Sequence, residues 1–206
     1  MNKTAKEVVW YATVCALIFV ARILDHMLQG LLTINPAVIT QTIAYVCILV
    51  RPTFINALGT GAAFGIMSLL TSVIYPTDTT QYFVNPLVSV LPRIMVGAAM
   101  WSVYRLIRKI GKKAEIPAIS VSCVIATIVN TFLVMTMLFV FMSRNEDLVY
   151  IAFLLRASVN FFLEVSIPAV ITPAIALGVR KGLKSAYDDC YIKERDIKEK
   201  NIEENK

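Results

Sequence analysis

The chain has 206 residues, of which 57% are hydrophobic and 17% are charged. Soluble domains carry about 25% charged residues, so the composition excludes an ordinary soluble protein and predicts an all-α integral membrane protein. The net charge of +6 does not indicate a nucleic-acid partner, because the basic residues lie beside apolar segments, as in the cytoplasmic loops of membrane proteins. The four cysteines show neither metal-site spacing nor a disulfide framework.

Six apolar segments approach the length of about 20 residues that a membrane-spanning helix requires. The first resembles a signal peptide, but it is too long and no small-residue cleavage site follows, so we expect a retained helix. The second is short and could be tilted or partly re-entrant. Together the segments predict a six-helix membrane bundle over residues 1–184; in chain order they run over about Glu7–Leu28, Pro36–Val50, Pro52–Ile74, Asn85–Ile107, Pro117–Met142 and Leu148–Val179.

The distribution of basic residues predicts the orientation of the bundle. Arg144 is the only loop arginine expected on one side of the membrane. Because cytoplasmic loops are enriched in lysine and arginine, both termini are predicted to be cytoplasmic. Residues 185–206 are polar and dense in alternating charge, which predicts a cytoplasmic tail that is disordered or a frayed helix. The predicted cytoplasmic side carries Lys3, Lys6, Arg51, Arg105, Arg108, Lys109, Lys112, Lys113, Arg180, Lys181 and Lys184.

Small residues recur at four-residue spacing in three of the predicted helices, a pattern that lets helices approach closely. Most of these ladders are expected to pack inside the bundle. The ladder in the first segment could instead contact a separate protein. The ladders comprise Ala12 and Ala16 in the first segment, Ala57, Gly61 and Gly65 in the third, and Ala118, Ser122, Ala126 and Asn130 in the fifth.

Polar side chains inside the apolar segments are the strongest functional signal, because each costs free energy in lipid. Arg156, Asn160 and Glu164 are spaced i, i+4, i+8 and so share one helical face. Arg93, two turns from Asn85, is predicted to share a cavity with three of these polar residues: Asn130, Asn160 and Glu164. Gln41, with Tyr45 four residues later, could join them. One arginine with several amides suits a small solute that carries a carboxylate or a phosphate.

Other polar residues favour structural interpretations. Arg22 and Asp25 are expected to satisfy each other at i, i+3. His26 is the only histidine, and it has no cluster of metal ligands around it. No catalytic motif is present, so we expect neither an enzyme, a cofactor nor a metal site. Any uphill transport must then draw its energy from a partner or an ion gradient.

The run Asn85-Pro86-Leu87-Val88-Ser89-Val90-Leu91-Pro92-Arg93, followed by Gly97, and the Ala12–Ala16 pattern carry a family resemblance. With the size and the six expected helices, they resemble the substrate-binding S components of energy-coupling factor (ECF) vitamin transporters, over about residues 5–184. The resemblance implies a multi-pass protein of a bacterial cell membrane. It would capture a small vitamin from outside and deliver it by toppling in the lipid bilayer.

The resemblance also implies roles for particular residues and partners. Ala12 and Ala16 would contact the transmembrane coupling subunit, and two cytoplasmic ATPases would complete the complex. Residues 31–36 would gate the ligand, and the outer loop at residues 75–84 would add Tyr82 and Phe83 as lids. Arg93 and the amides favour a pantothenate-like acid, since folate and riboflavin would need more aromatic stacking surface.

Three alternatives remain at the level of sequence. The first is a stand-alone secondary transporter or channel for a small polar solute. The second is a membrane enzyme, for which Asp25 and His26 are the adjacent titratable pair. The third is an assembly subunit in which the polar stripe is purely structural.

Overall fold

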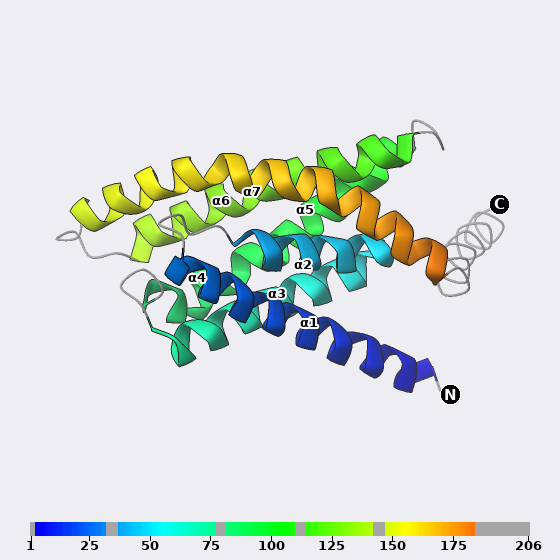
Figure 1. Ribbon diagram of the computed structural model, residues 1–206, viewed down its shortest axis with the longest axis horizontal. Coiled ribbons are helices and arrows are strands. Elements are labelled where there is room, and N and C mark those ends of the chain that lie inside the picture. Colours follow the sequence, from blue (N-terminus) through cyan, green and yellow to red (C-terminus); the bar gives the residue numbers. More distant parts are fainter. Residues whose placement is uncertain (1–2, 32–36, 77–80, 110–113, 142–146, 184–206) are drawn as a thin grey trace, which may run out of the picture.

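The computed structural model describes residues 3–31, 37–76, 81–109, 114–141 and 147–183, and every regular element in these ranges is helical (Figure 1). The charged tail and residues 32–36 of the predicted gating loop at residues 31–36 lie outside the described residues, while Leu31 belongs to α1. The elements are α1 (Lys3–Leu31), α2 (Val38–Val50), α3 (Phe54–Ile74), the 3-10 helix η1 (Gln81–Val84), α4 (Pro86–Ser89), α5 (Leu91–Arg108), α6 (Glu115–Phe141) and α7 (Asp147–Gly182).

The long helices form a ring in which α1 contacts α3, α3 contacts α5, α5 contacts α6 and α6 contacts α7. Helix α2 closes the ring between α7 and α1, and it also contacts α3 and α5. The start of α1 and the end of α7 lie at the same end of the bundle, which we call the basal end (Figure 1). The distal end holds the end of α1, the start of α2 and the short helices η1 and α4.

Five of the helical stretches are long and apolar enough to cross a membrane. The chain is therefore a multi-pass helical membrane protein. Helix α2 is the exception, because its 13 residues extend only about 20 Å, against a hydrocarbon core of about 30 Å. Of these 13 residues, 11 are buried by the neighbouring helices.

Charged side chains from other helices cap both ends of α2. At its start Asp25 of α1 accepts hydrogen bonds from the backbone N–H groups of Ile39 (3.1 Å) and Thr40 (2.8 Å) and from the Thr40 hydroxyl (2.5 Å). At its end Arg180 of α7 donates from Nε (2.8 Å) and Nη2 to the carbonyl of Leu49. A carboxylate at the N-terminus and a guanidinium at the C-terminus also complement the helix dipole. The short helix can therefore end inside the bundle without exposing unpaired backbone groups to lipid.

Three prolines in the helices each remove a backbone donor, and a polar side chain lies at each freed carbonyl. Proline lacks the N–H that would bond the carbonyl four residues earlier. The carbonyl freed by Pro92 accepts from Arg93, and the one freed by Pro173 accepts from Ser120. The one freed by Pro168, that of Glu164, lies 3.5 Å from the Thr127 hydroxyl, which is closer, at 3.0 Å, to the carbonyl of Cys123. Helix α7 thus continues through both of its prolines, with a gentle curve (Figure 1).

The fourth predicted segment forms one apolar helical stretch over Pro86–Arg108, with a local irregularity at Val90 between α4 and α5. Val90 keeps helical dihedral angles, and Pro92 accounts for the irregularity because it cannot donate to the preceding turn. The ladder of α3 packs directly on this segment. A Cβ on Gly65 would lie 2.6 Å from Cα of Val90, and one on Gly61 would lie 2.5 Å from the carbonyl oxygen of Arg93. The expected packing role of this ladder is confirmed.

Candidate functional site

Arg93 lies near the distal end of α5 and is almost fully buried, with 6% of its surface exposed. Its Nη1 donates to the carbonyl of Val88 at 2.8 Å. The guanidinium lies over the rings of Phe64 of α3 (5.7 Å) and Phe83 of η1 (5.4 Å). Its Nε is buried and has no hydrogen-bond partner within the described part of the chain. Arg93 is therefore held in place by protein groups while part of its donor capacity remains unused.

Two carboxylates from different helices lie at the start of α2. Asp25 of α1 accepts from the backbone of Ile39 and Thr40, and Glu164 of α7 faces the backbone N–H of Ala37. None of the three ion pairs formed by the described residues includes Arg93. Both carboxylates are thus directed at the backbone before and within α2.

The predicted stripe on α7 is only partly described. Asn160 is buried, with 7% of its surface exposed, and Glu164 is partly buried. Arg156 belongs to the turns of α7 whose side chains lie outside the described residues. The cavity that Arg93 is predicted to share with Asn160 and Glu164, and the role of Arg156, therefore stay predictions.

Asn130 and Gln41 differ in how their amides are used. The Oδ1 of Asn130 on α6 is buried and finds no hydrogen-bond partner among the described residues. Gln41 on α2 is 1% exposed, and its Nε2 donates to the Tyr45 hydroxyl (2.7 Å) and to the Thr127 hydroxyl (2.8 Å). Gln41 thus links α2 to α6 through its Nε2. The predicted contact of Gln41 with a ligand would have to use its side-chain oxygen, Oε1.

The residues around η1 and α4 shape the distal side of the site. Asn85 caps α4 by accepting a hydrogen bond from the backbone N–H of Leu87 at 3.0 Å. Phe83 covers the guanidinium of Arg93, and with Tyr82 it packs against Val88. The aromatic pair expected to act as a lid is therefore adjacent to Arg93 through Phe83.

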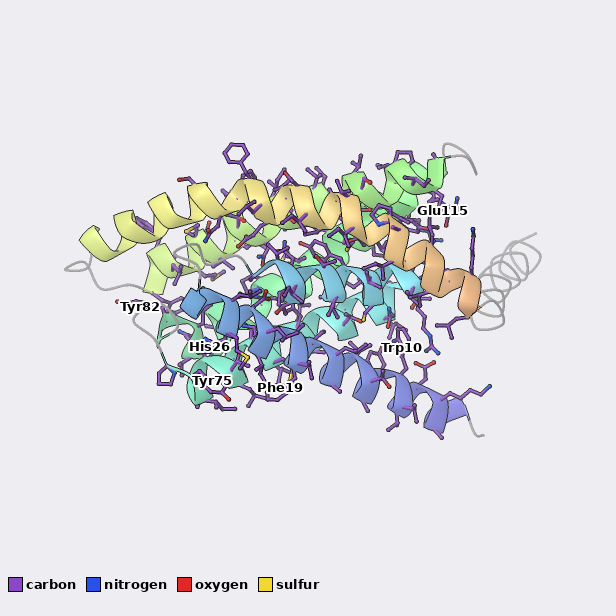
Figure 2. The ribbon with its side chains drawn as sticks, viewed as in Figure 1. Trp10, Phe19, His26, Tyr75, Tyr82 and Glu115 are labelled. Atoms are coloured by element: carbon purple, nitrogen blue, oxygen red, sulfur yellow. The ribbon has the colours of Figure 1, made fainter. Side chains whose placement is uncertain are left out.

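The expected pairing of Arg22 with Asp25 is wrong as a hydrogen-bonded pair. Both carboxylate oxygens of Asp25 bond the start of α2, and Arg22 Nε donates to the Thr71 hydroxyl at 3.4 Å. His26 does not join Asp25 either, because its ring stacks on Tyr75 with centroids 5.0 Å apart (Figure 2). Asp25 and His26, the adjacent pair on which the enzyme alternative depended, thus contact different partners: Asp25 the start of α2, and His26 the ring of Tyr75.

Ala12 and Ala16 lie on the exposed face of α1. This helix buries one narrow stripe against the bundle, Val14, Ile18, Ala21 and Asp25, and leaves its other faces outside. By contrast, Ala118, Ser122 and Ala126 of α6 are fully buried. The two ladders therefore have different surroundings: the one on α6 packs inside the bundle, and the one on α1 does not.

Sequence reasoning did not single out Thr127, Phe64 or Thr71 for this region. Threonine and phenylalanine are common in membrane helices, so their sequence positions gave no signal. The packing of the helices places Thr127 at Gln41, Phe64 at Arg93 and Thr71 at Arg22. The sequence matches no protein-family model and no curated protein. The class that fold and site define is thus a multi-pass helical membrane protein with a buried, incompletely paired arginine.

Proposed function

We propose that this chain is the substrate-capture subunit of an ATP-driven ECF importer for a small water-soluble vitamin or vitamin precursor. The observation that carries the proposal is the environment of Arg93, a buried guanidinium with an unused Nε donor inside an apolar bundle. A buried charge without a partner is costly, and an anionic ligand would supply the missing partner. A purely structural arginine would be expected to satisfy its donors within the protein.

The orientation that favours this function places the basal end in the cytoplasm of a bacterial cell. Lys6, Arg51 and Lys181 lie at that end with other basic residues, in keeping with the enrichment of cytoplasmic loops in lysine and arginine. All six apolar segments would then be embedded in the membrane, and the short α2 would be supported by its neighbouring helices. Arg93 would lie toward the outer surface, from which a nutrient arrives.

The unused donor and acceptor atoms of the bundle favour a small hydroxylated carboxylate such as pantothenate. Arg93 offers a cationic donor, and Asn130 Oδ1 on α6 is a buried acceptor without a described partner. The carboxylate of Glu164 on α7 would offer a further acceptor. Pantothenate carries one carboxylate together with hydroxyl and amide groups that can donate to such acceptors. The site would bind the carboxylate through charge and orient the remainder through hydrogen bonds.

The exposed small residues of α1 support a role for this helix in contacting the coupling subunit. Ala12 and Ala16 leave a shallow face on which a second helix can approach closely. The ATPases would be supplied by the partner complex, and toppling of the bundle would carry the ligand to the inner side.

Ligand identity is tested by mass spectrometry of small molecules that co-purify with the detergent-solubilised protein, followed by titration with pantothenate. We expect a stoichiometric ligand and tight binding, and Arg93→Ala should weaken binding at least about 100-fold, the scale on which truncating a buried charge pair acts. Arg93→Lys, which retains charge but not the planar fork, should lie in between. An empty protein that binds no vitamin in a panel would contradict the proposal. Uptake that follows an ion gradient without ATPases would favour the stand-alone transporter.

The coupling surface is tested by co-purification with an ECF coupling subunit and its ATPases. Ala12→Leu with Ala16→Leu should abolish the association and leave pantothenate binding unchanged, because the added side chains block close helix approach. Ala174→Leu, at an exposed alanine of α7, is the matched control and should retain the complex. Association that survives the double substitution would exclude this face of α1 as the contact.

A further inference from the structure

The arginines at the basal end differ in whether a carboxylate pairs with them. Arg51 pairs with Glu7, and Glu115 pairs with both of two further arginines, Arg108 and Arg180. No ion pair between described residues includes the remaining basal arginine, Arg105. The charge of Arg105 is therefore left without a described carboxylate.

Arg105 is nevertheless held in a defined place. It lies in the last turn of α5, and its Cζ is 5.0 Å from the centroid of the Trp101 ring, one turn earlier. Trp101 is itself anchored, because its Nε1 donates to the carbonyl of Pro52 at 3.0 Å and its ring contacts that of Phe54 at 5.1 Å. A guanidinium stacked on an anchored indole is pre-positioned, so a ligand that binds it has less side-chain freedom to restrict.

The surface around Arg105 is basic toward the basal end and apolar at the level of Trp101. Lys109 follows Arg105 by four residues and has helical dihedral angles, so the two cations share one face of α5 and repel each other. Four residues of helix rise about 6 Å. Beside Trp101, Phe54 is 44% exposed, and the next residue, Ile55, is 78% exposed. Exposed apolar residues, an anchored tryptophan and two cations thus follow one another toward the basal end.

We propose that Arg105 and Lys109 bind the phosphate of an anionic phospholipid whose acyl chain lies against Phe54 and Trp101. The planar fork of an arginine suits phosphate oxygens, and a tryptophan suits the boundary between headgroups and acyl chains. The site requires only that the helices cross a bilayer, so it is independent of the proposed capture of a vitamin.

The surroundings favour a lipid over a free phosphate, although both carry the same anionic group. A free phosphate would use the two cations alone, whereas a lipid also covers the exposed rings and side chains at the start of α3. A zwitterionic lipid carries a cation of its own and leaves the charges of Arg105 and Lys109 less well neutralised. The site is therefore expected to prefer a lipid with a net negative charge.

The test uses the full chain reconstituted in phosphatidylcholine vesicles. Brominated phosphatidylglycerol or brominated phosphatidylcholine is added, and quenching of tryptophan fluorescence reports lipid chains beside the indoles. We expect stronger quenching by the glycerol lipid, and Arg105→Gln should reduce this preference about fivefold, the scale on which one basic residue near a membrane surface acts. Arg51→Gln is the matched control: it removes the same charge from an arginine stacked on Trp10 at 4.3 Å, but one that Glu7 already pairs, and it should leave the preference unchanged.

Equal losses in Arg105→Gln and Arg51→Gln would mean that net charge alone attracts the lipid, and would overturn the inference, as would a wild-type protein without a preference. Sodium phosphate is added against sodium chloride of equal ionic strength. Loss of the quenching preference in phosphate alone would make the site one for free phosphate, whereas a retained preference supports the lipid. If Arg105→Gln does not fold, Lys109→Gln, at an exposed position, replaces it. A reduced preference in that variant supports the inference, and an unchanged one overturns it.

Discussion

Arg180 and Arg93 are two arginines of similar burial, with 5% and 6% of their surfaces exposed, at opposite ends of the bundle. Arg180 uses Nε and both terminal nitrogens: it bonds the carbonyl of Leu49, the Tyr104 hydroxyl (3.0 Å) and the carboxylate of Glu115 (2.5 Å). Arg93 makes one hydrogen bond, and its Nε is unused within the described residues. Similar burial therefore accompanies very different degrees of pairing.

Two asparagines, Asn56 and Asn130, show the same contrast in hydrogen bonding. At the basal end Asn56 accepts from Trp10 Nε1 (2.7 Å) and donates to the carbonyls of Cys47 and Arg51, which joins α1, α2 and α3 (Figure 2 labels Trp10). Near the middle of α6, Asn130 Oδ1 has no hydrogen-bond partner among the described residues. A saturated polar network fixes a structure, whereas unused donors and acceptors are available to a ligand. The unused Nε of the buried Arg93 guanidinium is what marks its surroundings as the candidate site.

The largest effect is expected at the saturated end. Arg180→Gln should lower the free energy of unfolding by about 3 kcal/mol, because it removes the guanidinium that bonds the buried carbonyl of Leu49 and the Tyr104 hydroxyl and that pairs with Glu115. Equilibrium unfolding in mixed detergent micelles measures this loss. Glu115→Gln alone should cost less, because Arg180 keeps its bonds to Leu49 and Tyr104 in that variant. A decrease in the free energy of unfolding below about 1 kcal/mol would contradict the conclusion that Arg180 is more completely paired than Arg93.

A second substitution tests how Arg93 is positioned. Pro92→Ala supplies an N–H that competes for the carbonyl of Val88, so the guanidinium should lose its anchor and pantothenate should bind about tenfold more weakly, a change of about 1.4 kcal/mol. Calorimetric titration measures this change. The control is Pro173→Ala, which restores the same kind of donor on α7, where Ser120 holds the freed carbonyl. Equal effects of the two substitutions would show that the anchor is not specific to the site.

A smaller effect is expected at the cap of α2. Asp25→Ala should destabilise the protein by about 1 kcal/mol, the typical cost of removing an N-cap. Asp25→Asn retains an acceptor oxygen and should lose less. Thermal unfolding of both variants in the same detergent compares them, and an Asn variant as unstable as the Ala variant would show that charge rather than hydrogen bonding dominates the cap.

The smallest effect on stability is expected for Arg93 itself. In the ligand-free protein, Arg93→Gln should change the free energy of unfolding by less than about 1 kcal/mol, because it removes a buried charge that has few partners. The added glutamine can still donate to Val88. The same unfolding measurement as for Arg180→Gln gives the direct comparison, and destabilisation equal to that of Arg180→Gln would identify both arginines as structural.

Much of the fold could be predicted from apolar segments alone. A helix lies over each of the six segments, and the ladder of α3 packs inside the bundle as expected. The irregularity at Val90 was not predicted, because a proline near the start of a segment is also compatible with a regular first turn. The side chain of Arg93 bonds the carbonyl that Pro92 leaves free.

The candidate site was less accessible to sequence reasoning. Arg93 and Glu164 stood out because ionisable residues are costly in apolar segments, and the structure buries Arg93 and places Glu164 against the backbone before α2. The partner of Asp25 could not be predicted, since spacing along one helix suggests Arg22, while the start of α2 competes for the same oxygens. Local spacing identifies possible pairs, and only the packing of helices decides among them.

Pro173 of α7 has a consequence for how such a sequence can vary. The proline leaves the carbonyl of Ala169 free, and the Ser120 hydroxyl of α6 bonds it at 2.9 Å. Loss of the proline restores the backbone donor, so the hydroxyl is no longer needed. Loss of the hydroxyl alone leaves a carbonyl without a donor at the contact between α6 and α7. Positions 120 and 173 are thus expected to covary, with the proline lost before the hydroxyl.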